Sequence, residues 1–154
     1  MEQEILKDWQ KKVIQFAAGL PDFSKFYLTG GTALSAYYLQ HRISDDLDFF
    51  SGEEIDPIFV HDLAQKIKSL LDVSEMRFSR IYDRWQFFYL SGGEELKIEF
   101  TKYPFSQLKA VSNFDGLAVD SEYDIAVNKL ATILDRFDPK DFVDLYFLLP
   151  KFPL

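Results

Sequence analysis

LTGGTAL at residues 28–34 and RISDDLDF at residues 42–49 are the two stretches that decide the fold of this chain. The first joins a short apolar run to two glycines and then to a segment rich in Ala, Leu and Tyr. This pattern predicts a strand, a tight turn and a helix from Thr32 to Gln40. The second stretch leads into the segment Asp46 to Phe50, in which acidic and apolar residues alternate before Phe50 and which predicts a buried strand.

Two of the three acids of the second stretch are placed to act together. Asp46 and Asp48 lie two residues apart in the predicted strand, so their carboxylates point to one face while Leu47 and Phe49 point into the core. Adjacent carboxylates repel each other unless a cation lies between them, and oxygen ligands in a chain without cysteine suit Mg²⁺ or Mn²⁺. Taken alone, an Asp-x-Asp pattern more often marks an exposed strand end or a helix cap.

The glycine turn adds context to the acid pair. Gly30 and Gly31 allow close approach of the backbone to a ligand, and the helix that follows offers unpaired N–H groups to an anion. Thr32 adds a hydroxyl group, although an ordinary tight turn with a Thr cap gives the same pattern. Turn and acid pair together predict a site where metal ions bridge the phosphates of a nucleotide during in-line displacement.

A third carboxylate commonly completes such a site and orients or deprotonates the attacking hydroxyl. Glu99 is the best candidate, because it shares the polar face of its predicted strand with Lys97 and that strand could lie beside residues 46–50. An exposed polar face on an antiparallel strand is the alternative interpretation.

The rest of the chain predicts one α+β domain with a mixed, mostly antiparallel sheet flanked by helices. Alternating polar and apolar residues over 73–103 predict a meander, and residues 117–119 a short strand. Helical spacing and capping residues predict four further helices, over residues 5–16, 57–71, 121–136 and 139–149. We expect a core over about residues 24–119 and a helical C-terminal part over about 120–150.

Composition narrows the function. Within 154 residues, 47% are hydrophobic and 17% aromatic, which predicts a self-folding chain, and the absence of cysteine with only two histidines argues against a zinc site. The net charge of −8 disfavours broad binding to nucleic acid. A solvated strand face or a local basic track would explain six basic residues of the middle stretch, Arg77, Arg80, Arg84, Lys97, Lys102 and Lys109.

No apolar run approaches the roughly 20 residues that a membrane span requires. The first four residues, MEQE, are acidic where a secretory signal would be basic. We therefore expect a cytoplasmic protein without a membrane partner.

The two opening stretches resemble the first motif of the AbiEii/AbiGii toxin nucleotidyltransferases. DIAVNKL at residues 124–130 and RFDPKDFVDLYFL at residues 136–148 are similar to that family's later motifs, in matching order. The resemblance covers about residues 27–149. It implies a polymerase-β-like nucleotidyltransferase fold, a nucleoside triphosphate donor, Mg²⁺, and membership of a toxin–antitoxin or phage-defence operon.

The resemblance also implies roles for single residues of the first motif. Gly31 and Thr32 match phosphate-binding positions, beside Gly30 in the same turn. Asp46 and Asp48 match the metal ligands. Together with Glu99, these two acids form the metal site that we predict.

In the later motifs, Lys129 matches the conserved lysine and Asp144 the conserved acid, so both are candidate catalytic residues. Four more positions match the motifs without an assigned role, of which we expect the first two to bind nucleotide: Arg42, Ser44, Lys140 and Asp141. On physical grounds, Lys129 lies beside an apolar stripe and could either contact phosphate or only extend to solvent. Asp141 and Asp144 share a helix face and could equally pair with Arg136 or Lys129.

The predicted function is the Mg²⁺-dependent transfer of a nucleoside monophosphate to a hydroxyl of RNA (including tRNA), protein or a small molecule. Many members of the family carry further helices on the acceptor side, so we expect that a second copy of the chain or a cognate antitoxin could complete this cleft. The alternative is a module of the same fold that binds nucleotide or a partner without turnover. Tyr37, Tyr38, Trp85 and Tyr89 could stack on a base, although such spacing is more typical of core residues.

Overall fold

The computed structural model describes residues 5–152, and the acidic residues 1–4 lie outside the described part. Its seven strands form one sheet in the order β3-β4-β5-β2-β1-β7-β6. The strands are β1 (Tyr27–Thr29), β2 (Leu47–Ser51), β3 (Glu75–Ile81), β4 (Arg84–Ser91), β5 (Glu94–Lys102), β6 (Ser112–Phe114) and β7 (Leu117–Val119). The longer helices are α1 (Asp8–Ala18), α3 (Pro57–Leu70), α4 (Glu122–Asp135) and α5 (Pro139–Leu148), and the shorter ones are η1 (Pro21–Lys25), α2 (Gly30–Leu34) and η2 (Ser35–Leu39).

The sheet is mixed and mostly antiparallel, which confirms the predicted fold class. Only the pairs β1–β7 and β2–β5 run parallel. In the centre, Asp48 of β2 lies opposite Thr29 of β1 and Glu99 of β5. The predicted meander is also confirmed, as β3, β4 and β5 pair antiparallel in sequence order.

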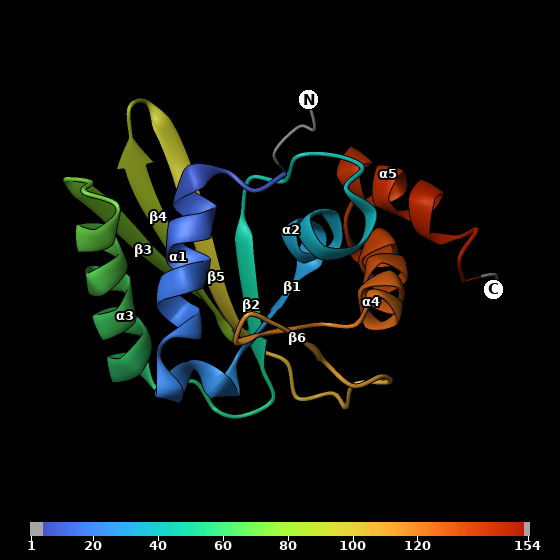
Figure 1. Cartoon of the computed structure of the whole chain (residues 1–154), viewed down its shortest axis with the longest axis horizontal. Helices are drawn as coiled ribbons and strands as arrows, with labels where there is room; N and C mark the ends of the chain where they lie inside the picture. Colours follow the sequence, from blue (N-terminus) through green and yellow to red (C-terminus); the bar gives the residue numbers. More distant parts are fainter. Residues whose placement is uncertain (1–4, 153–154) are drawn as a thin grey trace.

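The helices gather in two groups (Figure 1). Helices α1 and α3 lie beside each other next to the β3–β5 meander, whereas α2, α4 and α5 gather at the other end of the molecule. In the second group α2 contacts α4, and α4 contacts α5. The glycine turn that starts α2 therefore faces the two C-terminal helices, although about 90 residues separate them along the chain.

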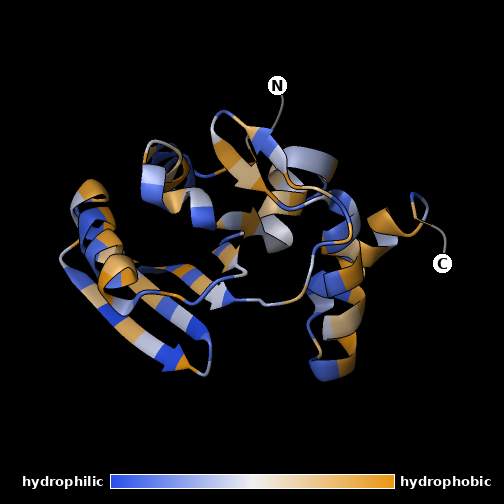
Figure 2. Cartoon of the chain, turned by 90° about the horizontal axis from the view of Figure 1, so that it is seen from below, coloured by the Kyte–Doolittle hydropathy of each residue, from blue (hydrophilic) through white to orange (hydrophobic). Residues whose placement is uncertain are grey.

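Aromatic side chains fill the core between the meander and the first group of helices. The ring of Phe49 lies 5.0 Å from that of Phe23 and 5.6 Å from that of Phe100. Figure 2 shows the alternation of hydrophobic and hydrophilic residues along the strands beside α3, which is the period expected of a sheet with one covered face. Burial of these rings holds β2 and β5 together, and with them Asp48 and Glu99.

The helix after the glycine turn differs from the one predicted for residues 32–40. It begins at Gly30 as α2 and continues as a π-helical turn, η2, which ends at Gln40 in a left-handed conformation with a φ of 51°. Pro21–Lys25 and Ser112–Phe114 were not predicted as elements. The equally short β7 was recognised from its apolar run, whereas these two segments are mostly polar and carry no such signal. In the described part of the chain, every helix is too short or too polar to cross a bilayer.

Candidate functional site

A cavity of about 360 Å³ lies where the centre of the sheet meets α4 and α5. The glycine turn, the loop before β2 and both C-terminal helices contribute to its wall. Eight of the ten predicted site residues line it: Gly30, Gly31, Arg42, Ser44, Asp46, Asp48, Glu99 and Lys129. The other two, Thr32 and Asp144, are buried behind the wall.

The Thr32 hydroxyl is turned toward the loop before β2. It donates a hydrogen bond to the backbone carbonyl of Asp46 and lies 2.9 Å from the Ser44 Oγ. On the other side of this loop, the buried Gln10 side chain donates to the Ser44 carbonyl at 2.8 Å. The loop that carries Asp46 is therefore held by α1 and α2 together, and Thr32 fixes the loop where a phosphate contact was expected.

Both glycines of the turn are required by close neighbours. Gly30 has a φ of +77°, and a Cβ there would lie 2.8 Å from the Asp48 Oδ2. A Cβ on Gly31 would lie 2.5 Å from Arg42 Nη2 and 3.2 Å from the Ser44 Oγ. The turn thus leaves room for a carboxylate on one side and a guanidinium on the other.

Asp48 is a half-buried carboxylate without a cationic partner of its own. Within residues 5–152 neither Asp46 nor Asp48 forms an ion pair, and burial followed by the charges of Glu99 and Asp46 raises the pKa of Asp48 to about 7. Burial likewise raises the pKa of Asp46. An uncompensated acid pair of this kind is electrostatically suited to a cation.

Glu99 has the opposite environment although it pairs with Asp48 across β2 and β5. Its carboxylate accepts hydrogen bonds from Arg84, Gln86 at 3.3 Å and Thr101 at 3.2 Å, and Lys97 Nζ lies 3.2 Å away. Burial would raise its pKa, but the Arg84 hydrogen bond and the charge of Lys97 outweigh burial and lower the pKa to about 2. Glu99 is 5% exposed, and its cationic neighbours neutralise its charge. It therefore does not lie on an exposed strand face, which was the alternative interpretation of its sequence.

These contacts bear on a metal site. Among residues 5–152, no group of three or more His, Asp or Glu side chains is arranged to hold a metal ion. Asp46 and Asp48 fit a divalent cation, because they are two neighbouring carboxylates that no cationic side chain of residues 5–152 neutralises through an ion pair. Metal binding by Glu99 remains a prediction, since four protein donors already surround its carboxylate.

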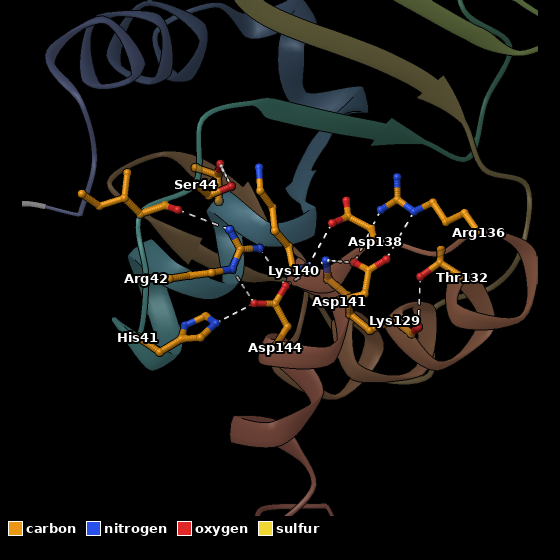
Figure 3. A network of polar contacts seen from close by, with 12 residues as sticks. His41, Arg42, Ser44, Lys129, Thr132, Arg136, Asp138, Lys140, Asp141 and Asp144 are labelled. Carbon is orange, nitrogen blue, oxygen red and sulfur yellow. Dashed lines mark hydrogen bonds and ion pairs between the residues drawn. The ribbon is translucent and has the colours of Figure 1, made fainter.

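Asp144 connects the C-terminal helices to the loop before β2 (Figure 3). Its fully buried carboxylate accepts from Arg42 Nε at 2.7 Å and Arg42 Nη2 at 2.8 Å, and it lies 2.6 Å from His41 Nε2 and 2.9 Å from Lys129 Nζ. Burial would raise its pKa, but the Arg42 hydrogen bond and the Lys129 charge lower it to about 2. Asp144 thus positions Arg42 above Gly31.

Lys129 is held between two acids of α5. Its Nζ lies 2.8 Å from the Asp141 Oδ1 and 2.9 Å from the Asp144 Oδ2, and the residue is 8% exposed. Asp141 also accepts from Arg136. Asp141 pairs with both of its predicted partners, and the Lys129 charge is balanced inside the protein.

Sequence reasoning missed part of the cavity wall. Arg84 and Lys97 line it, whereas the other four residues of the predicted basic stretch do not: Arg77, Arg80, Lys102 and Lys109. The sequence did contain a signal for Lys97, because Lys97 and Glu99 share one strand face.

Of the four aromatic residues considered for stacking, Trp85 and Tyr89 are buried in the core and Tyr37 and Tyr38 pack on Phe114. The aromatic residue that lines the cavity is Phe50.

Comparison with known proteins places these features in a family. The family model described as "Nucleotidyl transferase AbiEii toxin, Type IV TA system" matches residues 16–154. An uncharacterized protein of Aquifex aeolicus (strain VF5) is 34% identical over 146 residues, which are 95% of this chain and 68% of that protein.

Two solved structures are similar in fold. JHP933 from Helicobacter pylori superposes with a TM-score of 0.70 at 22% identity, and the match covers 94% of this chain and 64% of JHP933. The Megavirus polyadenylate synthase superposes with a TM-score of 0.56 at 16% identity, over 95% of this chain and 30% of the synthase. The chain therefore spans less than two thirds of the length of both proteins.

The raised pKa of Asp48 gives a stability prediction. An Asp is ionised above a pKa of about 3.9 in the unfolded chain and above about 7 in the fold, so the fold loses stability as pH rises between these values. Replacing Asp48→Asn should stabilise the metal-free protein by on the order of 2 kcal/mol at pH 8 and by little at pH 4. Urea denaturation in EDTA across this range measures the difference. The exposed Asp22→Asn serves as control, and an equal effect of both substitutions would contradict the assignment.

The ion pairs of Lys129 give a second prediction. Lys129→Met leaves Asp141 and Asp144 with one cation fewer in a buried site, so unfolding free energy should fall by about 3 kcal/mol. Adding Asp141→Asn should recover part of that loss, whereas the exposed Lys12→Met should change little. Urea denaturation of the three variants tests this. Unchanged stability with selective loss of triphosphate binding would instead assign Lys129 to a phosphate contact.

Proposed function

This chain belongs to the AbiEii nucleotidyl transferase toxin family, and on that basis we propose that its cavity binds a nucleoside triphosphate and transfers the nucleoside monophosphate to a hydroxyl group. The observation that carries the proposal is the position of Asp46 and Asp48 beside the Gly30-Gly31 turn, without an ion pair to any residue from 5 to 152, in a cavity also lined by cationic side chains. Acids and cations share this cavity wall, as a site that holds both a divalent cation and the phosphates of an anion requires.

The cations are the groups that would hold the phosphates. Arg42 lies above Gly31 and is oriented by Asp144, while Arg84 and Lys97 enter from the meander. Lys140 lines the cavity and forms no ion pair within residues 5–152. We propose that these side chains orient the triphosphate so that its α-phosphate faces the acid pair.

We propose Mg²⁺ or Mn²⁺ as the cofactor, held by Asp46 and Asp48. When bound, the cation would neutralise charge that develops on the phosphates. Glu99 has a pKa of about 2, so it stays ionised and is a weak base. Its proposed role is therefore to orient an incoming hydroxyl and to fix Arg84, more than to remove the proton.

The acceptor is proposed from the chemistry of the family and not from this cavity alone. A hydroxyl of RNA, including tRNA, or of a protein is the proposed acceptor, and the proposed partners are a cognate antitoxin and a second copy of the chain. The acceptor and the partner would both bind at the open side of the cavity, where the exposed Arg136 and Lys140 lie. A cytoplasmic location is proposed with these partners.

Incubation with each α-labelled NTP, total RNA and Mg²⁺ tests the reaction. The parent chain should transfer label from at least one NTP, and EDTA should abolish transfer. Asp48→Ala should lower the rate by at least about 10²-fold without unfolding the protein, because it removes a preorganised charge that acts in the transition state. NTP binding without transfer to RNA or protein would favour the alternative of a binding module, and affinity unchanged by EDTA would contradict the metal role.

The glycine turn gives a matched pair of variants. Gly31→Ala should weaken NTP binding about tenfold, because the added Cβ would displace the Arg42 guanidinium. Since that guanidinium also pairs with the buried Asp144, the free energy of unfolding should fall as well, and binding is measured where the variant is folded. Gly52→Ala is the control, as its Cβ would meet only the Tyr103 carbonyl at 4.0 Å. Calorimetric titration with NTP measures both. Equal affinities for the two variants would show that Arg42 does not contact the nucleotide.

A further inference from the structure

Helix α5 is apolar on the side that faces away from the protein. Two of its three charged residues, Asp141 and Asp144, are buried together with Leu145 and Leu148, and the third, Lys140, lines the cavity. The outer side carries six apolar or aromatic residues that are between 42% and 82% exposed, from just before the helix to just after it: Phe137, Phe142, Val143, Tyr146, Phe147 and Leu149. We call these six residues the α5 face.

The α5 face is one continuous surface. Residues four apart on a helix are neighbours, so Phe142 adjoins Tyr146 and Val143 adjoins Phe147. The ring centres of Tyr146 and Phe147 lie 5.3 Å apart, and those of Phe137 and Phe142 lie 5.5 Å apart. At about 200 Å² for a fully exposed aromatic side chain, the six residues leave roughly 650 Å² accessible to solvent. This area exceeds the roughly 300–600 Å² of the largest apolar patch on a typical monomer.

The distribution of residues around α5 is that of a helix covered on both sides. A helix that is apolar all round is normally buried, because each apolar side has to be removed from water. The inner side packs on the protein, whereas the outer side lies at the outer end of the helices that gather around the cavity (Figure 1). Among residues 5–152 the α5 face keeps the exposure given above, so a cover has to come from another molecule.

Area and charge favour a second copy of this chain as that molecule. Each partner of a standard interface contributes about 600–1,000 Å², and the α5 face supplies roughly 650 Å² before any flanking residue is added. The chain has a net charge of −8, so two copies repel each other over most of their surfaces. The α5 face carries no charged side chain, and two copies therefore meet there with the least repulsion. The lack of cations on this face also argues against nucleic acid as the partner.

We propose that the α5 face pairs with the α5 face of a second copy about a twofold axis. Tyr146 lies in the middle of the exposed arc of the helix, so the axis brings the two Tyr146 side chains close to each other. The proposal assigns a surface to the second copy that the proposed function names as a partner. It does not depend on nucleotide transfer, because the α5 face is present without a nucleotide.

The proposed dimer also reinforces the site. The ring of Phe147 lies 5.1 Å from that of His41, whose Nε2 lies 2.6 Å from the Asp144 Oδ1. A second copy that covers Phe147 would press α5 against the loop that carries His41 and Arg42. Lys140 lies on the same helix and lines the cavity, so the open side of the cavity would adjoin the second copy.

Sedimentation velocity of the full chain without nucleotide tests the dimer. The parent should sediment with twice the 18.0 kDa mass of the chain at about 50 µM, since interfaces of this size bind with micromolar or tighter affinity. Tyr146→Glu should raise the Kd of the dimer at least about 100-fold, because two negative charges would face each other in an apolar interface. Tyr82→Glu is the matched control, as it adds the same charge at a tyrosine that is 91% exposed in the β3–β4 turn, and it should keep the parent Kd.

A mixture of two variants decides whether the α5 face pairs with itself. Tyr146→Glu and Tyr146→Lys should each be monomeric, and their equimolar mixture should form a heterodimer, because opposite charges then meet across the axis. Both should give the circular dichroism spectrum of the parent, since Tyr146 is 74% exposed.

Three outcomes would overturn the proposal: a parent that is monomeric at the stated concentration, equal dissociation of the Tyr82→Glu and Tyr146→Glu variants, or a mixture that stays monomeric. A monomeric parent would leave the α5 face to a different protein. The label-transfer assay with NTP is a separate measurement, so failure of the dimer and failure of the proposed function can be told apart.

Discussion

The buried carboxylate of Asp144 is the contact on which the site depends. It lies on the last helix, yet its partners are His41 and Arg42 from the loop before β2 and Lys129 from α4. A buried ion pair is costly to break, because the partner that remains is left uncompensated. Asp144 therefore fixes where the C-terminal helices stand relative to the glycine turn, and it places one wall of the cavity opposite the other.

The second constraint is the difference in electrostatic environment between two adjacent acids. Asp48 and Glu99 pair across neighbouring parallel strands, and both carboxylates face the cavity. Arg84 and Lys97 stabilise the charge of Glu99, whereas Asp48 is left with burial and with like charges, so the pKa values move apart to about 2 and about 7. Environments that separate neighbouring pKa values in this way are typical of groups with different tasks.

The central motif could be predicted from sequence because its signals are local. Strand alternation places Asp46 and Asp48 on one face, the glycines mark the turn, and Asp138-Pro139 marks the start of α5, which the structure confirms. The partners of these residues could not be predicted in the same way. The strand order brings Glu99 next to Arg84 and Gln86. The contact between α2 and α4 determines which cations lie near Asp144. Neither of these long-range arrangements leaves a periodic pattern in the sequence.

Lys129 shows how long-range packing changes the meaning of a residue. Beside an apolar stripe, a lysine can extend to solvent or to a phosphate, and both readings assume that its charge is free. Two acids from α5 balance that charge inside the fold, so Lys129 stabilises the junction between the helices. Among residues 5–152, Asp46, Asp48 and Lys140 line the cavity without an ion pair, and it is these groups that a bound anion and its cation would neutralise.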